Sequence, residues 1–143
     1  MDLLRSCFTL LFCVFLLASP SSAQDLACPV SLSVQQTAAS VPAGWEATAS
    51  SEPVHLSRVA FYLKNPREGG ALVPDKSEKQ KDEERVTWSF VSGPGDEFWL
   101  GCVYTETTVL LAQRLKKGIS RCVVRYGLLP SGSRIRVKSI SCK

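Results

Sequence analysis

The most reactive side chains in this sequence belong to six cysteines, and the chain has a single histidine, His55. A cysteine can act as a nucleophile, ligate a metal or form a disulfide. Structural zinc sites usually contain closely spaced cysteine pairs of the CxxC kind, and none is present. A zinc site would therefore need widely scattered ligands. We predict no metal centre and no cofactor, which leaves disulfide formation as the expected role of the cysteines.

Disulfides persist in oxidising compartments, and the N-terminus of the chain predicts export to one. Residues 1–23 have the layout of a secretory signal peptide: Asp2 and Arg5, then an apolar run over residues 7–18, then Ser19-Pro20-Ser21-Ser22-Ala23. The apolar run is too short to span a bilayer comfortably. We expect cleavage before Gln24, with an uncleaved membrane anchor as the alternative. Residues 24–143 would then form a single periplasmic or secreted domain without a transmembrane anchor.

Cleavage would remove Cys7 and Cys13, so that four cysteines remain in the exported domain. An even number of cysteines in an exported domain indicates disulfides, and four cysteines allow three pairings. The pairing we favour joins Cys28 to Cys142 and Cys102 to Cys122. The first bridge would tie the start of the domain to its end, and the second would link two strands of the C-terminal sheet.

The dominant period of the apolar residues is two, which is typical of β-strands. Short strands separated by turn residues are expected over residues 30–34, 56–63, 85–92, 98–105, 108–115, 119–126 and 133–142. This pattern predicts a mainly β domain, an antiparallel meander that forms a small sandwich or barrel and is stapled by disulfides. Residues 75–85 contain no apolar residue. We expect them to form a charged, exposed loop, with a partner-docking segment as the alternative.

Catalytic motifs are missing from the sequence. No GxSxG, SxxK, P-loop or HExxH pattern is present, and the histidine follows Glu52-Pro53-Val54, a turn-like context in which a surface role is common. The carboxylates that could support acid–base chemistry, apart from the charged segment, are those of Glu46, Glu52, Asp96, Glu97 and Glu106, and several fall in predicted turns, where acidic residues are frequent for solubility alone. We predict a non-catalytic protein, with an enzyme that uses acidic residues as the alternative.

One aromatic residue is a candidate for partner binding. If Phe98 and Tyr104 face the core, Trp99 must leave the opposite face of the same strand, because successive side chains alternate. An exposed tryptophan would then contact a ligand or partner. Packing against a covering loop is the alternative for Trp99.

A basic face is the second candidate for partner binding. The last strand carries three cations at a period of two, and the strand before it adds two more. The residues are Arg134, Arg136 and Lys138, with Arg121 and Arg125. They could dock an acidic protein or an envelope polysaccharide, or simply protect an edge strand from aggregation. With export and a net charge of only +4, we expect no nucleic-acid partner.

Four segments of the chain resemble a family of small exported proteins of Gram-negative bacteria that has no assigned activity. They are Cys28-Pro29, Val41-Pro42-Ala43-Gly44-Trp45, and the stretches at 98–104 and 118–126. The resemblance implies a periplasmic location and adds no catalytic residue. An association of that family with secretion systems would allow an immunity-type inhibitor. The Trp99, Cys102 and Tyr104 strand also resembles periplasmic lysozyme inhibitors at the level of the fold.

These patterns predict a small, non-catalytic binding or inhibitor-like protein of the periplasm or the extracellular space. Two further functions stay open. The first is a carbohydrate- or peptidoglycan-binding module that would use Trp88 and Trp99 as stacking platforms. The second is an immunity-type inhibitor of a hydrolase that attacks the cell envelope.

Overall fold

The computed structural model describes residues 24–49 and 51–143. The predicted signal peptide, residues 1–23, lies outside the described residues. Within the described part of the chain, no helix is long and apolar enough to cross a membrane.

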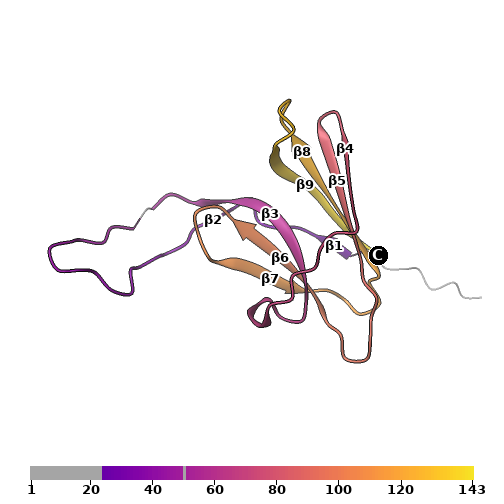
Figure 1. The fold of residues 1–143 in the computed structure, drawn as a ribbon, viewed down its shortest axis with the longest axis horizontal. Coiled ribbons are helices and arrows are strands. Elements are labelled where there is room, and N and C mark those ends of the chain that lie inside the picture. Colours follow the sequence, from indigo (N-terminus) through magenta and orange to yellow (C-terminus); the bar gives the residue numbers. More distant parts are fainter. Residues whose placement is uncertain (1–23, 50) are drawn as a thin grey trace, which may run out of the picture.

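The described residues form two antiparallel sheets (Figure 1). The five-stranded sheet has the order β1 (Gln24–Leu26), β9 (Arg134–Cys142), β8 (Arg121–Leu128), β5 (Glu83–Ser89) and β4 (Lys76–Gln80). The four-stranded sheet has the order β2 (Ser31–Leu32), β3 (Val54–Leu63), β6 (Phe98–Tyr104) and β7 (Leu110–Arg114). A short 3-10 helix, η1 (Pro66–Glu68), follows β3.

The two sheets pack as a sandwich, which confirms the predicted mainly β, disulfide-stapled fold. The β4–β5, β6–β7 and β8–β9 pairs are hairpins of consecutive strands, and the chain changes sheet between them. Figure 1 shows the sheets diverging, so that the turn ends of β4–β5 and β8–β9 project beyond the four-stranded sheet.

Aromatic side chains from both sheets fill the core, because the period-two pattern points them to the same interior. Phe61 of β3 is fully buried, and its ring lies 5.0 Å from that of Trp88 and 5.5 Å from that of Phe90 between centroids. The hydroxyl of Tyr126 on β8 accepts a hydrogen bond from the Val59 backbone N–H on β3, at 3.3 Å. This bond joins the sheets across the core, and burial raises the pKa of Tyr126.

The disulfides differ from the pairing favoured by the sequence. The structure joins Cys28 to Cys102 and Cys122 to Cys142, with Cα–Cα distances of 5.7 and 4.1 Å. The first bridge connects the segment between β1 and β2 to β6. The second joins directly opposed residues of β8 and β9. The predicted Cys28–Cys142 and Cys102–Cys122 bridges are therefore wrong.

The charged segment at 75–85 is not a loop. Residues Lys76–Gln80 form β4, which pairs with β5 along the edge of the five-stranded sheet. Every residue of β4 is exposed, and its charged side chains suit an edge that must not pair with other chains. Because all of its residues are exposed, β4 needs no apolar side chain and leaves no apolar pattern in the sequence. The first residues of β5 also belong to this segment, and Glu84 among them is buried.

Candidate partner-binding surfaces

Arg134, one of the predicted partner contacts, turns toward the interior face of the five-stranded sheet. Its guanidinium donates two hydrogen bonds to the carboxylate of Glu84, at 2.7 and 2.9 Å. It also lies over the Tyr126 ring, 4.1 Å from the centroid. The Ser77 hydroxyl donates a further bond to Glu84 at 2.6 Å. These contacts form an ion-pair cluster of Arg134 and Glu84, joined by Ser77 and Tyr126, at the projecting end of the sheet.

The Glu84 carboxyl is strongly acidic because of this cluster. The hydrogen bonds from Arg134 lower its pKa from an ordinary 4.5 to about 2, with help from Ser77 and against the opposing effect of burial. The side chain of Glu84 is only 5% exposed, so a charge there requires a partner. Arg134 therefore supports the fold by neutralising a buried carboxylate.

Two irregularities in the β8–β9 pairing explain why the basic residues of β9 do not share one face. The register skips Ile135 and Lys138, and each extra residue shifts the alternation of the strand. Arg136 and Lys138 lie over Gly127 on the outer face, where a Cβ on this glycine would meet each of them at 3.4 Å. The predicted stripe is therefore split, with Arg134 inside and the other two outside.

Lys138 is paired on this outer face. Its Nζ lies 3.4 Å from Glu83 Oε2 and 3.7 Å from Asp82 Oδ2. Such exposed pairs contribute little to stability. Lys138 is thus partly neutralised, whereas no ion pair of Arg136 is formed within the described residues.

A shallow basic groove runs along the same outer face. It is lined by the cations Arg85, Arg121, Arg125 and Lys143, with Val123, Ser139 and Ser141 between them. Arg85 of β5 lies directly opposite Arg125 of β8, and Arg121 leaves the same face of β8. Like charges at directly opposed sheet positions are destabilising. The nearest acidic partner of Arg125 is Glu83, at 3.8 Å.

Sequence reasoning found Arg121 and Arg125 but missed Arg85 and Lys143. The signal for Arg85 was present: Val86 and Trp88 face the core, so Arg85 must face outward. The exposed loop expected at residues 75–85 includes Arg85 and hides this signal. Lys143 follows the last strand, and only the folded sheet brings it beside Arg121.

Trp99 leaves the outer face of β6, as predicted, but it is only half-buried there rather than freely exposed. Tyr62 of β3 and Arg114 of β7 lie directly opposite it on the neighbouring strands. Gly101 allows the Tyr62 ring to lie on this face, because a Cβ on this residue would be 2.6 Å from Tyr62 Cε2. The Trp99 indole N–H is buried and finds no acceptor within the described residues.

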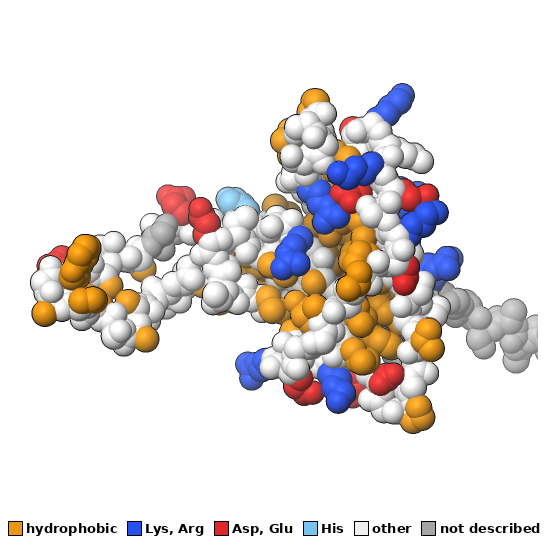
Figure 2. All heavy atoms as spheres, viewed as in Figure 1, with side chains coloured by type: hydrophobic (Ala, Val, Ile, Leu, Met, Phe, Trp, Pro, Cys, Tyr) orange, Lys and Arg blue, Asp and Glu red, His pale blue; other side chains and the backbone are white. Residues whose placement is uncertain are grey.

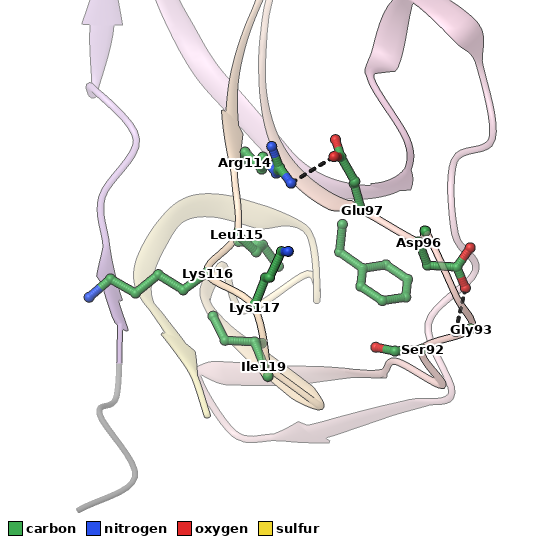
Figure 3. A pocket seen from close by; sticks show the side chains of 12 residues that line it. Ser92, Gly93, Asp96, Glu97, Arg114, Leu115, Lys116, Lys117 and Ile119 are labelled. Carbon is green, nitrogen blue, oxygen red and sulfur yellow. Dashed lines mark hydrogen bonds and ion pairs between the residues drawn. The ribbon is translucent and has the colours of Figure 1, made fainter.

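A cavity at the end of the sandwich lies between the β5–β6 and β7–β8 connections (Figure 3). Its apolar lining includes Phe98, Leu115 and Ile119. Glu97 points to Arg114, with an ion pair of 2.6 Å, and Asp96 accepts a hydrogen bond from the Gly93 N–H at 2.7 Å.

The carboxylates of this cavity are therefore engaged in structural contacts, an arrangement that does not resemble a general acid and base facing a substrate. His55 is exposed on β3, away from these acids. Within the described residues, no cluster of His, Cys, Asp and Glu could hold a metal ion.

Comparisons with known proteins agree with the expected family of small proteins. The chain is 28% identical over 129 residues to an uncharacterised 16.3 kDa protein encoded in the trpG 5' region of Azospirillum brasilense, and the match covers 85% of each chain. No solved structure matches the chain. The sequence profile of the type VI secretion system Tli immunity proteins matches residues 50–143, which contain β3 to β9. Because this match covers most of the chain and both sheets, the protein belongs to the type VI secretion system Tli immunity protein family.

Proposed function

We propose that this protein is an immunity protein that binds a type VI effector protein and blocks its toxicity. The observation that carries the proposal is the family match, which extends over both sheets of the sandwich. The described surface fits this function, because it offers charged and aromatic contacts and no recognisable catalytic group. Inhibition would therefore be stoichiometric, with one bound partner blocked by each folded molecule.

We further propose that the protein acts in the periplasm, after removal of residues 1–23. Two disulfides are a feature of oxidising compartments and support this location. The target would then be an effector that acts on the cell envelope, where a periplasmic inhibitor can meet it.

The basic groove is our candidate for the first electrostatic contact with an acidic effector surface. Arg85 and Arg125 oppose each other at some cost to the sheet, and an acidic partner would relieve that repulsion. Arg136 and Lys138 extend the same face, and Trp99 stays a candidate contact on the other sheet. We assign Arg134 to the fold, because Glu84 occupies it.

A carbohydrate-binding module is less well supported. Stacking on a sugar needs an open aromatic face, and Trp88 is only 5% exposed, with its indole N–H donating to the Leu72 carbonyl at 3.2 Å. Of the two tryptophans proposed as stacking platforms, the half-buried Trp99 would then have to bind the sugar by itself.

A contact-dependent competition experiment tests the proposed function and does not require the effector to be identified first. A strain that lacks this gene, and whose own type VI apparatus is inactive so that sister cells do not kill it, is grown with its type VI-active parent. We expect the deletion strain to be killed, and a plasmid copy of the full chain to restore survival. A copy that starts at Gln24 and stays in the cytoplasm should not protect.

The control for this experiment is a parent with an inactive type VI apparatus, which should not kill. If the deletion strain survives the active parent as well as the complemented strain does, the proposed immunity function is wrong.

A further inference from the structure

The longest irregular segment of the described chain is an arm between β2 and β3. We define the arm as residues 33–49 and 51–53, since residue 50 lies outside the described residues. Figure 1 shows it reaching away from the sandwich, on the side opposite the C-terminus. Long loops without secondary structure are uncommon in compact domains and are often functional.

The base of the arm is attached to the sandwich. The Gln36 side chain donates to the Glu106 carbonyl at 3.1 Å, and the Leu56 N–H donates to the Val30 carbonyl at 2.8 Å. Val34 packs against the core. The Cys28–Cys102 bridge holds the chain just before β2. The arm therefore projects from a fixed base.

The end of the arm presents one large apolar side chain. The Trp45 N–H donates to the Pro42 carbonyl at 3.2 Å, and Gly44 has φ +84°, a conformation that glycine adopts without strain. This turn leaves Trp45 74% exposed, with Val41 beside it at 44%. Figure 2 shows apolar side chains gathered at the far end of the arm.

The composition of the arm makes it narrow and free of positive charge. Apart from Val41, Pro42, Trp45 and Glu46, residues 38–49 are alanine, glycine, serine or threonine. No lysine or arginine occurs in the arm. A thin segment with a single bulky end suits entry into a cleft, whereas the shallow basic groove suits contact with a flat acidic surface.

We infer that the arm inserts into an apolar cleft of the effector and that Trp45 is the anchor that fills it. This inference rests on the proposed immunity function and names the part of the chain that would recognise the target. Tryptophan is among the residues that are enriched at the positions that dominate binding energy at interfaces. The family match begins at residue 50, so residues 33–49 of the arm, with Trp45, lie outside it, and this part of the arm is also a natural place for specificity toward one effector.

The test compares Trp45→Ala with wild type in the competition experiment. We expect Trp45→Ala to lose protection while keeping the wild-type melting temperature, because the side chain has few contacts to lose. Val91→Ala, at a position 93% exposed outside the arm, is the matched control and should protect fully. With the effector purified from cells, Trp45→Ala should weaken binding by at least about 30-fold.

A second variant separates the anchor from the rest of the arm. Trp45→Phe keeps an aromatic side chain and should retain part of the protection. Wild-type protein should also show reduced acrylamide quenching of its fluorescence when the effector is added, and Trp45→Phe should lose most of that change.

The outcomes distinguish the two proposals. If wild type restores survival and Trp45→Ala protects equally well, the arm is not the anchor, although the immunity function stands. The inference is also overturned if Trp45→Ala acts by dissociating a wild-type dimer, which sedimentation would detect. If wild type itself fails to protect, the immunity function is wrong, and the inference is lost with it.

Discussion

A single buried carboxylate governs the acid sensitivity expected of this protein. Glu84 has a pKa of about 2 in the folded state, against an ordinary 4.5, chiefly because Arg134 donates two hydrogen bonds to it. A lowered pKa stabilises the folded state at every pH above the unfolded value. That stabilisation is lost as the pH falls from about 4.5 through about 2, as the carboxylate takes up a proton.

We therefore predict that Glu84→Gln loses stability at neutral pH and flattens the acid transition. The shift corresponds to about 3 kcal/mol at most between pH 5 and pH 2 in wild type. The free energy of unfolding, measured in urea at several pH values, should depend less on pH in Glu84→Gln. Glu78→Gln, at an exposed position of β4, is the control and should change stability by less than about 0.5 kcal/mol. Parallel pH profiles for wild type and Glu84→Gln would contradict this assignment.

At the scale of strands, the two disulfides constrain different parts of the sandwich. Cys28–Cys102 closes 74 residues, whereas Cys122–Cys142 closes 20 within a hairpin that is already paired. The chain-entropy description gives about 4 and about 3 kcal/mol for loops of these lengths. Replacing Cys28 and Cys102 with alanine should therefore lower the melting temperature more than replacing Cys122 and Cys142 does.

Mass spectrometry of a non-reduced digest checks the pairing itself. It should recover a peptide that contains Cys28 linked to one that contains Cys102. Recovery of a Cys28–Cys142 link would contradict the structure.

The irregular register of β9 also shows where the sequence stops being informative. The strands at 54–63, 98–104 and 134–142 follow from their apolar alternation. The two residues of β9 that have no partner in the β8 register, Ile135 and Lys138, cannot be recognised from this alternation. In a regular hairpin continued from the Leu128–Arg134 pair, Cys122 would oppose Ile140. The irregularities bring Cys142 opposite instead, so both the disulfide pairing and the split of the basic stripe depend on geometry that the pattern does not encode.

Two other features, the strand β4 and the burial of Trp99, could be predicted from the sequence only in part or not at all. The edge strand β4 forms through backbone pairing with β5 and has no apolar residue to reveal it. The alternation did place Trp99 on the outer face of β6, but its half-burial depends on neighbours such as Tyr62, which the fold alone supplies.

At the scale of the whole molecule, the surface combines a broad basic face with a projecting arm whose end carries no positive charge. Opposite charges on two proteins speed their encounter, whereas buried aromatic anchors slow their separation. Under the proposed immunity function, we expect the basic groove to govern the rate of association with the effector and the arm to govern the lifetime of the complex.

The basic groove gives a prediction that separates binding from stability. Arg125→Thr removes the repulsion with Arg85, so its free energy of unfolding should stay within about 0.5 kcal/mol of wild type. Its protection in the competition experiment should nevertheless fall, and adding Arg121→Thr should lower it further. Stopped-flow measurements should show slower association and a weaker dependence on salt. A double variant that protects and associates like wild type would remove the basic groove from the interface.

The disulfide pairing has a consequence for how the protein is made. Within residues 24–143 each bridge joins neighbours in the order of the cysteines, Cys28 with Cys102 and then Cys122 with Cys142. A chain that crosses a membrane with its N-terminus first exposes these thiols in that same order. An oxidase that links thiols as they emerge would produce the native pairs directly, without the reshuffling that crossed bridges require. Under the export to the periplasm that we propose, maturation of this protein should depend on the periplasmic oxidase and be indifferent to a disulfide isomerase.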